Sequence, residues 1–69
     1  MVLVFKTSVT SEWEILQLSP VINKLAPEIQ WNFDLEDCDN ILRIISREVM
    51  PIQVIRLLQQ YKYECEELE

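Results

Sequence analysis

The sequence predicts a small α+β domain whose strands and helices follow the order βαββαβ. Residues 3–9 and 29–36 alternate apolar and polar side chains, as strands with one covered face do. Each is joined to a segment whose apolar residues repeat with helical spacing. The 69 residues leave room for a single domain, residues 1–69, with one modest core. We expect an antiparallel sheet in strand order 4-1-3-2, with both helices on one face.

The first predicted strand spans residues 2–9, with odd-numbered side chains on the covered face and even-numbered ones on the open face. A helix follows, because Ser11 stands three residues before Glu14 in the pattern of a capping box. Its buried stripe has helical spacing and comprises Ile15, Leu18, Ile22 and Leu25. Pro20 inside this helix predicts a kink, or a restart with Ser19 as a second N-cap.

The second and third predicted strands, residues 28–36 and 41–47, form an antiparallel hairpin around a polar turn at residues 37–40. Acidic residues gather near this turn and could attract a hard cation, namely Asp34, Glu36, Asp37 and Asp39. Their spacing matches no known calcium loop, so a solvated acidic rim is the favoured interpretation.

The second predicted helix begins at Met50-Pro51, with proline in its first turn. Its buried face is expected to hold Val54, Leu57, Leu58 and Tyr61. Residues 63–66 alternate as a short fourth strand, and the tail at 66–69 is expected to fray. The sharp passage from helix to strand places Lys62 where glycine is usual.

The charge balance argues against a polyanionic partner. Six basic residues against twelve acidic ones give a net charge of −6, which repels nucleic acid and anionic lipid. No apolar run approaches the roughly 20 residues that span a bilayer. The opening apolar run lacks the basic flank and cleavage site of a signal peptide. We therefore expect a cytoplasmic protein that binds neither nucleic acid nor membrane.

Catalytic chemistry has no signal in the sequence. Histidine, the usual general base, is absent, and so is glycine, which phosphate-binding loops require. The carboxylates lie on polar strand faces, where nothing indicates desolvation. We therefore expect no catalytic residues, no cofactor and no enzymatic activity.

The two cysteines are expected to be reduced and separate. Cys38 falls in the hairpin turn and Cys65 in the last strand, so they belong to opposite edges of the predicted sheet. Three strand spacings place them about 14 Å apart, whereas a disulfide needs Cα atoms within about 7 Å. Cys65 is expected to face the core as a small apolar residue. Cys38 is the candidate reactive thiol.

The loop after the first strand carries a family resemblance. Phe5-Lys6-Thr7-Ser8-Val9-Thr10 leads into Ser11-Glu12-Trp13-Glu14 at the start of the first helix. This pattern resembles the heavy-metal-associated domains of copper chaperones and metal-pumping ATPases, which have a ferredoxin-like fold. The resemblance extends over nearly the whole chain, through residues 19–23, 40–42, 54–55 and 63–66.

The resemblance fails at the metal-binding motif. The family carries Cys-x-x-Cys at the start of the first helix, where this chain has Ser11 and Glu14. Soft thiolates select Cu(I), and a serine hydroxyl does not replace them. The resemblance therefore implies the family's fold without its metal activity, and no metal ligand is expected at Ser11, Glu12, Trp13 or Glu14.

These observations favour a non-enzymatic protein-interaction module that acts on a protein partner or on a second copy of itself. The open sheet face is the candidate interaction surface, with Val2, Val4, Ile41 and Ile45 as an apolar patch beside Arg43. Trp13 either faces solvent as a binding residue or folds over its loop. One alternative is residual heavy-metal binding through Cys38 or the acidic loops, and another is a dimeric small-ligand sensor.

Overall fold

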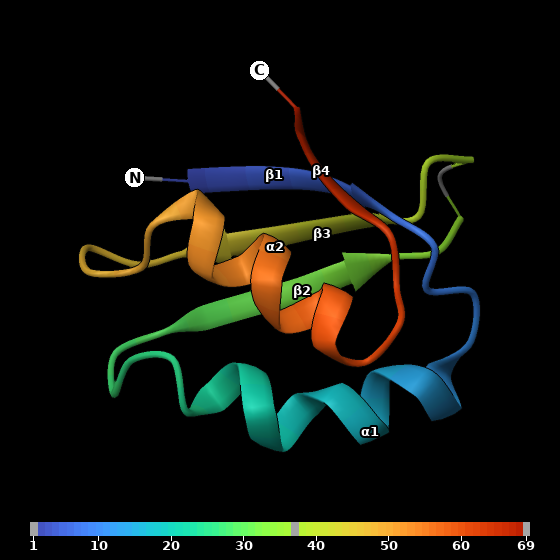
Figure 1. Ribbon diagram of the computed structural model, residues 1–69. Helices are drawn as coiled ribbons and strands as arrows, with labels where there is room; N and C mark the ends of the chain where they lie inside the picture. The colour runs from blue at the N-terminus through green and yellow to red at the C-terminus, as the bar shows by residue number, and fades with distance from the viewer. Residues whose placement is uncertain (1, 37, 69) are drawn as a thin grey trace.

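The computed structural model describes residues 2–36 and 38–68, which form a four-stranded antiparallel sheet and two helices. Figure 1 shows the elements in chain order, namely β1 (Val2–Thr7), α1 (Glu12–Asn23), β2 (Gln30–Asp34), β3 (Ile41–Ile45), α2 (Pro51–Gln60) and β4 (Cys65–Leu68). The strand order β2-β3-β1-β4 is the predicted 4-1-3-2 read in the other direction. The α+β class and strand order are confirmed, and the arrangement is compatible with a ferredoxin-like fold.

The core lies between the sheet and both helices. Alternate residues of β1 and β3 point into it, and the register sets Phe5 opposite Leu42 and Leu3 opposite Ile44. The helices contribute fully buried side chains to the same cluster, namely Leu18 and Ile22 from α1 and Val54 and Leu58 from α2. Both helices therefore cover one face of the sheet, and the other face is left open.

Helix α1 begins at the predicted N-cap, Ser11, and continues to Asn23 without a restart. The expectation that Ser19 forms a second N-cap is wrong. Pro20 removes the hydrogen bond that the carbonyl of Leu16 would accept, but both residues are exposed. Because water can satisfy that carbonyl, one continuous helix accommodates the proline.

Helix α2 buries Val54 and Leu58 completely and Leu57 partly, as predicted. The prediction that Tyr61 joins this buried face is wrong, because its side chain is exposed. The helix ends at Gln60, so Tyr61 leaves the helical stripe before its ring can pack inward.

The last strand lies two residues later than predicted. The amide of Tyr63 still donates to the carbonyl of Leu58 at 3.0 Å, which closes the end of α2 and delays the strand. β4 then pairs with β1 as far as Leu68, which stands opposite Val4. The expected fraying is therefore wrong for residues 66–68, and residue 69 lies outside the described residues. The first three strands are each shorter than predicted.

Among residues 2–36 and 38–68, two residues have positive φ, Asn40 at 49° and Lys62 at 69°. Both hold sharp turns, before β3 and between α2 and β4. The prediction that Lys62 occupies a position usual for glycine is confirmed. A side chain with a Cβ atom makes this left-handed conformation less favourable by about 1–2 kcal/mol.

Replacing this lysine is expected to stabilise the domain. Lys62→Gly relieves the left-handed conformation at some cost in chain entropy, so unfolding should require about 0.5–1 kcal/mol more. Chemical denaturation measures this difference. Lys24→Gly is the matched control, because Lys24 follows α1 with an ordinary φ of −80°. It should lower stability, and a gain for both variants would contradict the explanation.

Candidate functional site

The β1–α1 loop is built as a helix cap. Ser11 Oγ accepts a hydrogen bond from the amide of Glu14 at 3.2 Å. Glu14 Oε1 in turn accepts from the amide of Thr10 at 3.0 Å and from the hydroxyl of Thr10 at 3.1 Å. The predicted capping interaction at Ser11 is confirmed, although the carboxylate reaches back to Thr10 and not to the Ser11 amide. Ser11 and Glu14 therefore both hold the start of α1.

Electrostatics at this cap favour an ionised Glu14. The pKa of its carboxyl is lowered, chiefly because the Thr10 amide donates to the charged form, and the Tyr63 hydroxyl also hydrogen-bonds to it. The pKa of Tyr63 is raised by desolvation and by its proximity to this carboxylate. The Glu14 carboxylate is therefore an acceptor for groups of its own loop and of the α2–β4 segment.

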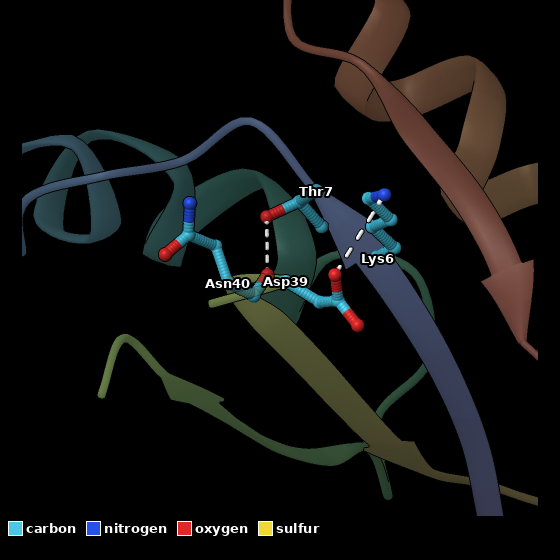
Figure 2. Close-up of polar contacts among 4 residues, drawn as sticks. All are labelled: Lys6, Thr7, Asp39 and Asn40. Atoms are coloured by element: carbon cyan, nitrogen blue, oxygen red, sulfur yellow. Dashed lines mark hydrogen bonds and ion pairs between the residues drawn. The ribbon is translucent and has the colours of Figure 1, made fainter. Parts of the chain in front are cut away.

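Three loops meet at this end of the sheet. Figure 2 shows the hydroxyl of Thr7 donating to the Asn40 carbonyl at 2.7 Å, beside the ion pair between Lys6 and Asp39 at 3.7 Å. The α2–β4 segment joins them, because the Ser8 amide donates to the Glu64 carbonyl and the Glu64 amide donates to Ser8 Oγ. We call Thr7, Ser8, Asn40 and Glu64 the loop clamp. It ties together the β1–α1, β2–β3 and α2–β4 loops at this end of the sheet.

Trp13 has 67% of its surface exposed to solvent. Of the two interpretations left open by the sequence, the solvent-facing one is therefore correct. Glu12 beside it is also exposed. Trp13 is available for contact with another molecule.

The apolar patch on the open sheet face differs from the predicted one, because Leu68 belongs to it and Ile41 does not. Val2 and Ile45 stand opposite each other and are exposed, while Val4 stands opposite Leu68. Val4 and Leu68 are half-buried. We call Val2, Val4, Ile45 and Leu68 the open-face patch.

Ile41 does not belong to the open-face patch, because only 5% of its surface is exposed. It lies between Lys6 and Asp34 in the sheet. These neighbours form ion pairs at 3.7 Å, Lys6 with Asp39 and Asp34 with Arg43. The prediction of an exposed Ile41 is wrong, and Arg43 is half-buried with its charge paired.

The two free thiols lie in different parts of the fold. Cys38 is exposed in the β2–β3 turn, and Cys65 is half-buried in β4 against the core. Among residues 2–36 and 38–68, no three His, Cys, Asp or Glu side chains are placed to hold a metal ion. Asp37, part of the predicted acidic rim, lies outside the described residues.

The two thiols are expected to react at different rates. Desolvation raises the pKa of Cys65 to about 12. At pH 8 such a thiol is thiolate in only about one molecule in ten thousand, and the thiolate is the nucleophile. Iodoacetamide should therefore modify Cys38 first, and modification of Cys65 should accelerate as pH rises toward 12. Peptide mass mapping measures both sites, and equal rates at pH 8 in the folded protein would contradict the assigned burial.

No family model, curated protein or solved structure matches this chain. The fold places it in the class of small α+β domains with an antiparallel sheet and one open face. Among the described residues, no helix is long and apolar enough to cross a membrane.

Sequence reasoning missed two residues that belong to the exposed surfaces. Leu68 falls in the tail that was expected to fray, and it breaks the alternation of residues 63–66, in which the even-numbered residues are polar. Leu16 lies outside the buried stripe of α1 and has 69% of its surface exposed. Because Leu16 lies off the helical spacing of the buried residues, its exposure could have been predicted from the sequence.

Proposed function

We propose that this chain is a non-enzymatic protein-interaction module with a domain resembling the heavy-metal-associated type and without its metal site. The observation that carries the proposal is the open-face patch, in which two exposed aliphatic side chains, Val2 and Ile45, are direct cross-strand neighbours. Contiguous exposed apolar residues on a small domain are typical of a contact surface.

The loop clamp supports the same proposal. The side chains at the family's ligand positions are committed to the helix cap, so they serve structure. Loops tied to each other by hydrogen bonds also lose less entropy on contact with a partner. A rigid end of the sheet that presents Trp13 therefore suits recognition of a folded surface.

The expected partner is a protein and not a nucleic acid. With a net charge of −6, the chain repels phosphate backbones, and two of its six basic groups, Lys6 and Arg43, are paired with carboxylates. We place the module in the cytoplasm, where a thiol such as the exposed Cys38 stays reduced.

Site-specific photo-crosslinking in the organism's own cells tests the proposal. A benzoylphenylalanine at Ile45 should capture one or a few defined proteins, including other copies of this chain. The same group at Gln60, which is exposed on α2 in the helix layer, is the control. Capture at Ile45 and not at Gln60 is the expected result, and equal patterns at both positions would contradict the proposal.

A further inference from the structure

We propose that β2 pairs edge to edge with β2 of a second copy of this chain, an interaction that goes beyond the proposed function because it uses a surface other than the open-face patch. The two edge strands of the sheet are β2 and β4, and they differ in how well they are protected from pairing with a strand of another chain. Acidic side chains in and beside β4 disfavour pairing with another strand, namely Glu64, Glu66 and Glu67. Helix α2 also packs against β4. β2 has one charged residue, Asp34, and its carboxylate is paired with Arg43.

An apolar groove lies beside the unprotected edge. It has a volume of about 410 Å³ between α1 and β2, and its lining consists of the apolar residues Ile15, Leu16, Trp31 and Phe33 together with Glu12 and Asn32. The two rings meet edge to face with centroids 5.9 Å apart, and Trp31 Nε1 donates to Asn23 Oδ1 at 2.7 Å. These contacts fix the Trp31 and Phe33 side chains, while the Leu16 side chain is largely exposed to water. Figure 1 shows α1 running along the β2 side of the sheet.

The sequence of β2 is complementary to itself in one antiparallel register. Placing Asn32 opposite its own copy pairs all five residues of the strand, so that Gln30 faces Asp34 and Trp31 faces Phe33. Amide meets carboxylate on the open face, and aromatic meets aromatic on the covered face. A shift that centres the pairing on Trp31 would set Glu28 against Asp34, which places like charges opposite each other.

This register keeps the helices of both copies on the same side of one continuous sheet. The two α1 helices then approach across the two-fold axis, and Leu16 of each copy can fill the groove. Because each copy carries a net charge of −6, the copies repel at long range, and salt should strengthen the pairing by screening. Salt would weaken binding of a basic partner in the same groove.

Sedimentation equilibrium tests the pairing. The chain should dimerise at concentrations between about one micromolar and several hundred micromolar. The dimer should be tighter in about 0.5 M salt than in about 0.05 M salt. Leu16→Lys should raise the dimer Kd by about tenfold or more. Ile52→Lys makes the same change at another exposed aliphatic residue, on α2, and should leave Kd within about twofold.

A disulfide at the two-fold axis tests the register. In a Cys38→Ser background, Asn32→Cys should form a covalent homodimer in glutathione buffer, because the two thiols face each other. Glu66→Cys is the control, because Glu66 is also exposed but lies on β4. Faster cross-linking of Asn32→Cys supports the register, and equal yields overturn it.

The outcomes separate this inference from the proposed function. A chain that stays monomeric at several hundred micromolar in both salts overturns the β2 pairing. The interaction module would still stand if Ile45 captured a different protein in cells. A dimer that Ile45→Lys abolishes and Leu16→Lys leaves intact would also overturn the β2 pairing, and it would assign self-association to the open-face patch.

Discussion

Thr7→Val is expected to lower the free energy of unfolding by about 1–3 kcal/mol, because it leaves buried polar groups without partners. The Thr7 hydroxyl donates to the Asn40 carbonyl at 2.7 Å and accepts from the Val9 amide at 3.2 Å. Valine has nearly the same shape but offers neither interaction. Val9 is completely buried, so water cannot replace the lost acceptor. The variant would loosen the loop clamp.

Urea denaturation measures this loss, with Thr7→Ser as the matched control. Serine keeps the hydroxyl and removes only a methyl group, so most of the stability should remain. In a domain of this size the valine variant should melt several degrees lower, by about 4–8 °C for each kcal/mol lost. Thr7→Val as stable as Thr7→Ser would show that the hydroxyl does not hold the loops together.

Ile45→Lys is expected to weaken the proposed interaction by about tenfold or more, because it places a charge in the open-face patch. With 46% of its surface exposed, Ile45 can be replaced without opening the core. A photo-crosslinker at Val2, its cross-strand neighbour, reports the interaction through the yield of captured partner.

Ile52→Lys is a close control for this measurement. Ile52 is exposed to the same extent, 46%, but lies on α2 in the helix layer. Its substitution changes the net charge equally and should leave the yield unchanged. An equal loss of cross-linking yield for the two variants would mean that the net charge of the chain, and not the open-face patch, governs the interaction.

Much of this fold follows from local patterns in the sequence. Alternation at Leu3 and Phe5, and helical spacing at Leu18 and Ile22, predicted core residues that the structure buries. The Ser11 cap was predictable because its bonds join residues only three positions apart. Such features depend on nearby residues, so one sequence suffices to find them.

The features that sequence reasoning missed depend on long-range contacts. Ile41 is buried in the sheet between Lys6 of β1 and Asp34 of β2, which are far apart in the chain. Leu68 is held by pairing with β1, which no local pattern indicates. The candidate groove likewise arises only where α1 comes to lie beside β2. No spacing rule within one segment predicts such contacts.

The claim that this domain works without a metal ion is tested most directly by Cu(I) competition. The reduced protein is titrated against a chromogenic Cu(I) chelator of picomolar affinity, alongside Cys38→Ser and Cys65→Ser variants. Because Ser11 and Glu14 are committed to the helix cap, they should take no Cu(I) from the chelator. Any Cu(I) that the protein does take should be bound by Cys38 and should be absent from the Cys38→Ser variant. Tight one-to-one binding that survives Cys38→Ser would contradict the proposed function.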